Sequence, residues 1–538
     1  MSTEKIDAFD SSSEREGSSS EFSGVTFVND EARALRKVDL TVLPLLTIGL
    51  FVFQLDRVNL ASALTGGFMK DVSINQDTVN LGNQLMFLGI VLLEIPSNMI
   101  LQRVGPRKYM AAQVFIFGLV ATMQTFLKNK TGFLVSRSIL GLCEAGYIPG
   151  SLYILSTWYR SEELAKRIAI FFFGMFAGTA FSPLLASAIL KLDDYNGVRG
   201  WRWIFMIEGL MTVFISAILL LFLPGSPQRP KPLLFKGLIR FTPRDQEVLQ
   251  HRLERNGTRL TDNSMIITPQ KVWQTVTHWR RWPHYISTCA VFATWAPLTT
   301  YTPTIIMNLG FERIPANALT SIGGIISLIT VFIFALISDR TNRRGFTVAL
   351  AISCYLIALI LLRTIHPSVS NKWRRYVLWT LVNSFAVGYH PVHNTWLQLN
   401  CTDPQERSIA IAMWVMSAIS GLMAGSQVFR AKDAPWYGTG VAVLIGMVGF
   451  GLVLAVMQIV VYWVFNRKLA AERKKMFELK GTLLVALENG DISKSGGVPC
   501  AAGRGQAMAG SDRKLLEQCS GTGNSVGGGV KSKLAEKG

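Results

Sequence analysis

The sequence predicts an all-α integral membrane protein with twelve transmembrane helices in two halves of six. Hydrophobic residues make up 49% of the 538 residues and charged residues 17%, and the apolar residues occur in long runs. A helix needs about 20 mostly apolar residues to cross a bilayer, and about twelve runs meet this requirement. A polar stretch separates the first six runs from the last six. The predicted spans lie near residues 40–62, 80–101, 109–127, 132–156, 168–190, 203–223, 283–308, 317–338, 346–363, 376–398, 408–428 and 440–465.

Composition divides the chain into five segments. Residues 1–37 are Ser-rich and acidic and predict a disordered cytoplasmic tail. Residues 38–223 and 283–466 are the two predicted six-helix halves, and 224–282 is a cytoplasmic connector. Residues 467–538 predict a second cytoplasmic tail that is mostly disordered, because a Gly- and Ser-rich stretch buries too little apolar surface to fold.

Two helix-start signals occur inside the connector. "TPRDQEVLQHRLER" from Thr242 has a capping Thr followed by Pro at the first helical position, and "TPQKVWQTVTHW" from Thr268 repeats this signal. We expect two short amphipathic helices resting against the inner membrane face. Six spans, a connector and six more spans are typical of transporters built from internal repeats, whose substrate site lies near the bilayer midplane.

The basic residues predict the orientation of the chain. The formal net charge is +19, which also occurs in nucleic-acid-binding proteins, but the Lys and Arg residues lie mainly in loops on one predicted side of the membrane. The positive-inside rule explains this distribution, so we expect a plasma-membrane protein with both termini in the cytoplasm and no nucleic-acid partner. The loop at 363–375 is basic on the outer side and is an exception.

A short basic turn recurs at the matching place in each half. "NMILQRVGPRK" (98–108) follows the second span, and "ALISDRTNRRG" (335–345) follows the eighth. Charges in these turns can tie helix ends together when the cytoplasmic side is shut, or they can be topology signals alone. The predicted cytoplasmic gate comprises Glu94, which we expect to pair with a basic loop residue, together with Arg103, Arg107, Lys108, Asp339, Arg340 and Arg343.

Four charged residues in the first and fourth spans are the leading functional candidates. An ionisable group inside a span is costly unless it faces a cavity or a partner. Arg137 and Glu144 are seven residues apart and share one helix face, and Gly141 in between permits close approach of a neighbouring helix. Together with Asp56 and Arg57 they predict a cluster of two acids and two bases. An anion that takes an Arg would leave an acid free to accept a proton; the alternative is a structural salt-bridge network.

Other polar residues in the spans receive weaker assignments. Glu208 follows "GWRWIFMI" and is predicted to pair with Arg202 at the outer interface. His390 and His393 line a cavity or pack in the core; without a third ligand they predict no metal site, and Pro391 between them should break the helix. The predicted substrate-binding set, to which no cofactor is added, is Arg57, Arg137, His390, Gln84 and Asn394.

Several motifs in order along residues 38–466 resemble a known family. They are "LDRVNL", "EIPSN" followed by "RVGPRK", "RSILGLCEAGYIPGSLYILSTWY", "GWRWIFMIEG", "PTIIMNLGF" and "GSQVFRAKDAPWY". The chain is thereby similar to the fungal allantoate permease-like branch of the anion:cation symporters, in the major facilitator superfamily. The resemblance implies the major facilitator fold and proton-coupled uptake of small organic anions. It also implies that Asp56, Arg57, Arg137 and Glu144 carry proton coupling and anion binding.

The chain departs from this family at three positions. Gln54 stands where many relatives have an aromatic residue, Ile90 where a Tyr is common, and Ile419 where an Asn is frequent. Some of the usual hydrogen bonds to substrate are therefore missing, so the motifs predict the mode of transport better than the identity of the anion.

Three functions follow from the sequence. The leading one is a monomeric secondary transporter, not an enzyme, that carries a small organic anion with protons across the lipid bilayer by alternating access. The anion is a carboxylate, ureide or vitamin such as allantoate, nicotinate or pantothenate. A non-transporting nutrient sensor of the same fold is an alternative. A membrane-embedded acyltransferase using His390 is another, although no nucleophile or nucleotide motif accompanies that residue.

Overall fold

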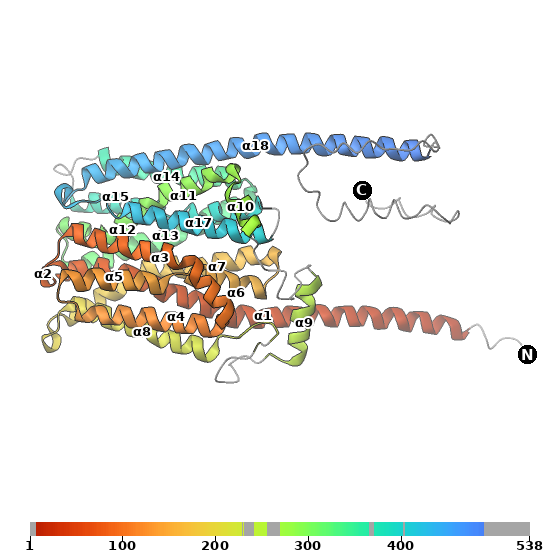
Figure 1. Cartoon of the computed structure of the whole chain (residues 1–538), viewed down its shortest axis with the longest axis horizontal. Coiled ribbons are helices and arrows are strands. Elements are labelled where there is room, and N and C mark those ends of the chain that lie inside the picture. The colour runs from red at the N-terminus through yellow and green to blue at the C-terminus, as the bar shows by residue number, and fades with distance from the viewer. Residues whose placement is uncertain are drawn as a thin grey trace, which may run out of the picture. The chain divides into compact units, whose positions relative to one another are not determined.

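The computed structural model describes the backbone of residues 7–228, 230, 241–255, 269–364, 371–401 and 404–488, and most of the side chains between Asn29 and Lys475. In this described part the regular elements are all helices, so the predicted all-α class is confirmed (Figure 1). By its contacts the chain divides into two compact units, Met1–Phe465 and Asn466–Gly538. All helix packing considered below lies within the first unit.

Helices α1 to α8 form the amino-terminal set. Their bounds are α1 Asp7–Thr65, α2 Phe68–Asp71, α3 Gln76–Val104, α4 Pro106–Met123, α5 Lys130–Glu144, α6 Tyr147–Trp158, α7 Ser161–Ile189 and α8 Gly200–Phe222. The side chains of Asn75 and Asn129 each accept a hydrogen bond from the backbone N–H of the third residue of the following helix, α3 and α5, respectively. Such N-caps satisfy donors that the first helical turn leaves unpaired.

Two short helices occupy the described parts of the segment between the sets. They are α9 Pro243–Arg255 and α10 Pro269–Val276, so each starts at the Pro of its predicted signal. Helix α9 is held against α1 by an ion pair between Lys37 Nζ and Asp245 Oδ2 at 2.6 Å. Helix α1 itself begins at Asp7, inside the segment predicted to be disordered. The tail after residue 488 lies outside the described residues.

Helices α11 to α18 form the carboxyl-terminal set. Their bounds are α11 Trp282–Ala293, α12 Trp295–Asn308, α13 Arg313–Thr341, α14 Arg344–Thr364, α15 Lys372–Phe385, α16 His390–Leu399, α17 Pro404–Gly425 and α18 Gly438–Glu488. In the described part, nine helical segments are long and apolar enough to cross a membrane, and α3, which bends by 52° between Glu94 and Pro96, makes ten. The pairs α11–α12 and α15–α16 are each interrupted near mid-length. Counted as two broken spans, they complete the predicted twelve.

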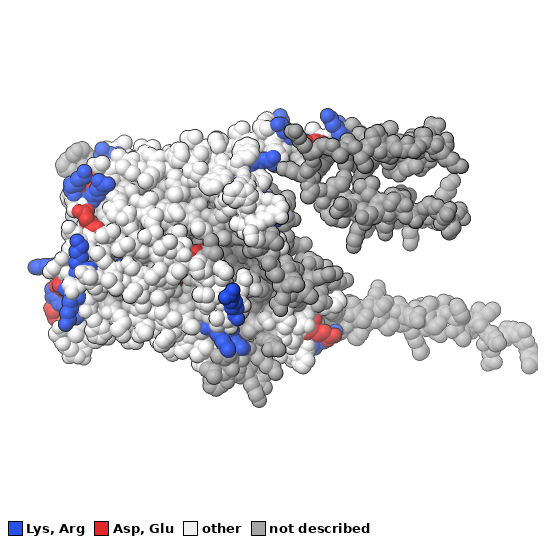
Figure 2. Space-filling model, in the orientation of Figure 1, with Lys and Arg blue, Asp and Glu red and all other residues white. Residues whose placement is uncertain are grey.

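The spans lie side by side, with their connections at two ends (Figure 1). The Asp71 end carries α2 and the starts of α3 and α13, and the Arg103 end carries the turns between α3 and α4 and between α13 and α14. On the face in Figure 2, charged side chains gather toward the ends and the band between them is nearly uncharged. That distribution is the one expected of a multi-pass protein whose apolar belt lies in the bilayer.

The two sets pack directly against each other. Helix α3 contacts α17, α1 contacts α12, and α7 contacts α13. At the last of these contacts a Cβ added to Gly324 would lie 2.6 Å from the Cα of Ala180. Such backbone proximity is typical of membrane helices that meet through small residues.

Candidate functional site

The centre of the amino-terminal set holds an ion pair between α1 and α5. Arg57 Nε donates to Glu144 Oε2 at 2.7 Å, and the two side chains are 9% and 0% exposed. The guanidinium also lies over the rings of Phe53 and Phe87, with 4.4 and 5.6 Å from Cζ to the ring centroids. A cation on aromatic faces and beside one carboxylate is stabilised without water. Glu144 Oε1 has no hydrogen-bond partner.

Arg137 lies two turns before Glu144 on the same face of α5 and is only partly satisfied. It is 1% exposed. Its Nη2 donates to Asn83 Oδ1 on α3 at 2.7 Å, whereas its Nε and Nη1 have no hydrogen-bond partner. A buried guanidinium with unsatisfied donors carries a desolvation cost that an anionic group would relieve.

A break in the fourth span positions these groups. Helix α5 ends at Glu144, and Gly146 adopts φ +84 before α6 starts at Tyr147. That conformation is in the left-handed region that favours glycine. A Cβ on Gly141 would lie 2.0 Å from the carbonyl oxygen of Met86, so α3 packs directly on α5. The close approach predicted from this glycine is confirmed.

Glu94 does not pair with a basic loop residue. It is 3% exposed on α3, its Oε1 has no hydrogen-bond partner, and the cation that acts on it electrostatically is Arg57. The bend of α3 follows it directly. The predicted pairing of Glu94 with a basic loop residue is therefore wrong, because the side chain is buried near Arg57 before the bend of α3.

Asp56 does not share the arginines with Glu144. It is fully buried and neither of its carboxylate oxygens has a hydrogen bond of good geometry. Its neighbours on α8 are Thr212 and Glu208. Adjacent residues on a helix point about 100° apart, which is why Asp56 and Arg57 face different surroundings. The predicted four-charge cluster is thus two groups.

Glu208 is not an interfacial partner of Arg202. Glu208 is 0% exposed and both of its carboxylate oxygens lack hydrogen-bond partners. The guanidinium of Arg202 instead lies over the ring of Trp201, 4.8 Å from its centroid. The Trp and Arg of the motif mark the helix end as expected, but Glu208 is two turns further into the span.

The predicted histidines occupy two different environments. His390 is 2% exposed, and its ring lies 4.3 to 6.0 Å from the rings of Trp414, Phe292, Phe172 and Phe176. The two last belong to α7, so the ring lies between the sets. Its Nδ1 has no hydrogen-bond partner. The helix break precedes His390, and Pro391 lies in the first turn of α16.

His393 is bonded to a residue that sequence reasoning did not single out. Its Nε2 is 2.8 Å from Nδ1 of His284 on α11, and His284 Nε2 is 3.1 Å from Tyr462 Oη. Asn394 is buried and its Oδ1 accepts a hydrogen bond from Gln398 Nε2 at 3.1 Å. In the described part of the chain no group of three or more His, Cys, Asp or Glu side chains is arranged to hold a metal ion.

A row of amides on α3 joins the two sets toward the Asp71 end. Asn80 Nδ2 donates to the carbonyl of Phe429 at 2.8 Å, and Asn83 Nδ2 donates to Thr300 Oγ1 at 3.2 Å. Gln84, predicted to bind substrate, donates to the carbonyl of Met423 and accepts from Gln427. Gln76 belongs to the same row. The spacing of these amides, four, then three or four residues, is that of one helix face and is visible in the sequence.

Two further bonds join the sets at the Asp71 end. Asn317 Nδ2 donates to Thr65 Oγ1 at 2.7 Å, and Arg313 Nη1 donates to Asp193 Oδ2 at 2.7 Å. Partial burial raises the pKa of Asp193, but the bonds from Arg313 and from the backbone of Gly200 outweigh it and hold this pKa below its ordinary value. The hydrogen bonds recorded between the sets thus gather toward one end of the bundle.

The predicted gate charges lie at the opposite end. Except for Glu94 they surround the α3–α4 turn, where Gly105 has φ +94, and the α13–α14 turn, where Asn342 has φ +53. Arg107 is half-buried, and the others are exposed: Arg103, Lys108, Asp339, Arg340 and Arg343.

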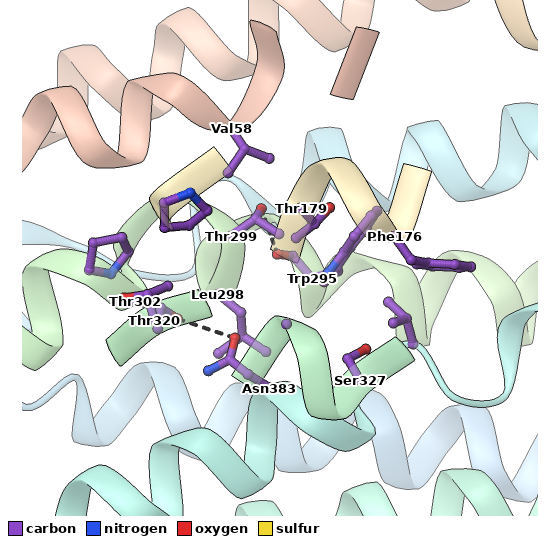
Figure 3. Close-up of a pocket in the computed structure, with 14 residues that line it drawn as sticks. Val58, Phe176, Thr179, Trp295, Leu298, Thr299, Thr302, Thr320, Ser327 and Asn383 are labelled. Carbon is purple, nitrogen blue, oxygen red and sulfur yellow. Dashed lines mark hydrogen bonds between the residues drawn. The ribbon is translucent and has the colours of Figure 1, made fainter. Parts of the chain in front are cut away.

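A small cavity lies between the sets (Figure 3). Side chains converge on it from α1, α7, α12, α13 and α15, among them Val58, Phe176, Trp295, Thr302 and Asn383. Thr302 Oγ1 donates to Asn383 Oδ1 at 3.3 Å. Its volume of ≈ 40 Å³ suits about three water molecules. Its described lining is uncharged, so the buried arginines lie outside it.

Comparison with known proteins identifies the family. A model of the Major Facilitator Superfamily matches residues 46–426. A Penicillium expansum MFS-type transporter, cnsO, is 29% identical over 456 residues, covering 81% of this chain and 83% of that protein. A Saccharomyces cerevisiae transporter, YIL166C, is 26% identical over 436 residues, covering 80% of each chain. A protein of Agrobacterium vitis that is named as a tartrate transporter is 29% identical over 334 residues, 61% of this chain and 72% of its own.

Solved structures agree on the fold. A bacterial homologue of the human lysosomal transporter Spinster, inward-facing and unoccupied, has a TM-score of 0.57 at 14% identity over 79% of this chain and 97% of its own. The xylose transporter XylE of E. coli, partially occluded and inward open, has a TM-score of 0.54 at 15% identity over 76% and 96%. With its apolar helices packed in two sets in the described part and a family model that covers most of its length, the chain belongs to the major facilitator superfamily.

Proposed function

We propose that this protein is a proton-coupled transporter that takes up a small organic anion by alternating access. The observation that carries the proposal is Arg137, a buried guanidinium with two unsatisfied nitrogen donors beside the Arg57–Glu144 pair. A planar guanidinium holds a carboxylate through two parallel hydrogen bonds. Arg137 and Arg57 together supply the positive charge for one such group.

Glu144 is the proposed coupling carboxyl on the anion side of α1. Its one recorded partner is Arg57. A substrate carboxylate that bonds to Arg57 and Arg137 displaces Glu144 from Arg57, and the displaced carboxylate is then buried without its ion-pair partner. Taking up a proton removes that charge and its desolvation cost. Anion and proton therefore enter the same occupied state.

The two ends of the bundle take the roles of outer and inner gates in this proposal. The amide row of α3 and the Asp193–Arg313 pair close the Asp71 end, which faces outward if the basic turns are cytoplasmic. The exposed charges at the α3–α4 and α13–α14 turns belong to the Arg103 end, and we infer that they close it in the opposite conformation. Glu94 is excluded from this gate by its place beside Arg57.

The proposed substrate class rests on the family resemblance of the motifs and on the name of one relative. The motifs resemble those of the allantoate permease-like branch, and this resemblance favours a carboxylate, ureide or vitamin such as allantoate, nicotinate or pantothenate. The Agrobacterium vitis relative adds tartrate. We propose that the protein acts as a monomer in the plasma membrane, with the segments 38–223 and 283–466 as its moving halves and both termini in the cytoplasm.

The two other candidate functions receive less support. A sensor of the same fold would bind the anion at the same arginines but would need no carboxyl group such as Glu144 to couple that binding to a proton. An acyltransferase using His390 would need a reactive neighbour, whereas the ring of His390 is surrounded by the rings of Phe172, Phe292 and Trp414.

Uptake into proteoliposomes tests the proposal. Purified protein is reconstituted, an inward proton gradient is imposed, and labelled allantoate, nicotinate, pantothenate and tartrate are offered in turn. We expect at least one anion to accumulate, and a proton ionophore to abolish accumulation. Accumulation that persists with the ionophore contradicts proton coupling, and binding without uptake favours the sensor.

A further inference from the structure

Asp56 and Glu208 face each other from α1 and α8. Both side chains are 0% exposed, and these two helices are in direct contact. Thr212 lies one helical turn after Glu208 on the same face of α8 and next to Asp56. Asp56 therefore points away from the anion-binding arginines and into the helix contact behind them.

These two carboxyl groups lack a cationic partner within hydrogen-bond distance in the described part of the chain. All four of their carboxylate oxygens are buried, and among the described residues none makes a hydrogen bond of good geometry with them. The charged group that acts on Glu208 is Asp56; on Asp56 it is Glu144 from α5. Both are acids, and the guanidinium of Arg57 on α1 is bonded to Glu144 instead. Two adjacent buried carboxylates without a cation are strongly unfavourable.

The hydroxyl of Thr212 fits a protonated neighbour. Thr212 Oγ1 donates its hydrogen to the backbone carbonyl of Glu208 at 3.1 Å. Thr212 also lies close enough to Asp56 to interact with its carboxyl group. A hydroxyl has one hydrogen and two lone pairs, so while that hydrogen is given to the carbonyl of Glu208 the hydroxyl can only accept from Asp56. An ionised Asp56 offers no hydrogen to it, whereas a protonated Asp56 donates one.

We propose that Asp56 and Glu208 form a proton-binding site on the α8 side of α1, and that the pair holds at least one proton in this conformation. With one proton, the acid of Glu208 donates to a carboxylate oxygen of Asp56; with two, Asp56 also donates to Thr212. In the transport cycle, a role that rests on the proposed function, this site takes up protons in addition to Glu144. Arg57 and Asp56 then serve the anion site and the proton pair from different faces of α1.

Infrared spectroscopy of the full-length protein in lipid tests the pair without any substrate. Protonated carboxyl groups absorb apart from carboxylates, and ordinary Asp and Glu side chains are ionised at neutral pH. We expect the unmodified protein to show protonated-carboxyl absorption at neutral pH. Glu208→Gln should remove part of it, and Asp56→Asn should shift or remove the same component. The control Asp77→Asn alters an exposed residue in the first turn of α3 and should leave the absorption unchanged.

Each outcome of the infrared experiment supports or overturns the proposed proton site at Asp56 and Glu208. If the unmodified protein shows no such absorption at neutral pH, or if Glu208→Gln leaves it intact, the pair holds no proton and the inference is overturned. Should Glu208→Gln fold poorly, the unmodified protein and Asp56→Asn still decide. A protonated pair in a protein that transports no anion would refute the proposed function and leave this site standing.

Discussion

The two sets of helices differ in what they bury. The amino-terminal set carries six ionisable side chains at its centre: Asp56, Arg57, Glu94, Arg137, Glu144 and Glu208. The cavity-lining part of the carboxyl-terminal set presents rings, hydroxyls and amides, such as Trp295, Thr302 and Asn383. A buried ion pair of this set, Arg281–Glu406, lies at the start of α11 and α17. Charge inside a membrane is costly and persists where it has a use. Under the proposed function, this difference assigns anion recognition and proton binding to the amino-terminal set, and the contribution of the carboxyl-terminal set to fit and movement.

The largest expected effect is in the amino-terminal set. One substitution there should abolish the coupling of anion accumulation to the proton gradient. Glu144→Gln keeps the shape of the side chain but cannot release a proton. We expect the variant to bind anion and to exchange labelled for unlabelled anion across a vesicle membrane. Accumulation driven by a pH gradient should be abolished, because the empty carrier can no longer return deprotonated. If the variant still concentrates anion in response to external acid, Glu144 is not obligatory for coupling.

The second-largest effect is expected at Arg57, the ion-pair partner of Glu144. Arg57→Lys preserves charge but removes the planar fork that binds a carboxylate at two points. Loss of a charge-assisted hydrogen bond corresponds to a decrease in uptake of about 10- to 100-fold. Arg202→Lys, which alters an arginine stacked on Trp201 near the end of α8, is the matched control and should transport normally. Unchanged apparent affinity of Arg57→Lys would remove this residue from the anion site.

A third substitution tests whether the carboxyl-terminal set contributes to the conformational change of transport. Asp339 lies exposed at the end of α13, in the turn proposed to close the Arg103 end. Asp339→Asn should slow turnover by about tenfold, the loss expected of one charged contact, and leave equilibrium binding of the anion nearly intact. Turnover is measured by uptake and binding by scintillation proximity on detergent-solubilised protein. A large loss of binding at normal surface expression would show that the gate assignment is wrong.

A smaller effect is expected at the hydrogen bond between Asn83 and Thr300, which joins the two sets. Asn83 accepts from Arg137 in its own set and donates to Thr300 in the other. Asn83→Ala should raise the apparent KM several-fold because one hydrogen bond that orients Arg137 is lost. Thr300→Val removes the contact between the sets alone, so it should increase labelling of a cysteine placed at the Asp71 end without changing KM. Equal KM changes in both variants would mean that Asn83 does not orient Arg137.

The smallest effect belongs to the Asp193–Arg313 pair, which joins the sets outside the spans. The pKa of Asp193 is lowered, so its stabilising contribution is present above the ordinary Asp pKa of about 4. It is lost as the pH falls through the lower pKa of the folded protein. Asp193→Asn should reduce the free energy of unfolding at neutral pH by less than about 1 kcal/mol, since the pair is partly exposed. Thermal unfolding should show this difference shrinking in strong acid; a difference that grows there would contradict the assignment.

The sequence predicted which residues carry the buried charges better than it predicted which of them are in contact. Arg57, Arg137 and Glu144 were predicted as charged candidates, and the structure brings Arg57 and Glu144 into contact and buries Arg137 near them. Glu94 was misplaced because the bend after it has no local signal except Pro96. The amides from Gln76 to Gln84 have the spacing of one helix face, which the sequence shows, but only Gln84 was predicted as a site residue. His284 could not be linked to His393, since their contact joins residues 109 positions apart.

By itself the sequence determined the helical membrane class, the six-plus-six order of the spans and the residues that bear buried charge. These properties follow from apolar run length and from the cost of an ion in hydrocarbon, both of which act locally along the chain. The tertiary structure decided which charges meet. Asp56 and Arg57 are neighbours in sequence, yet one faces Glu208 and the other Glu144, because a helix turns its side chains by about 100° per residue toward different neighbours. Partners of a buried charge are set by how the helices pack, and packing is a property of the whole bundle.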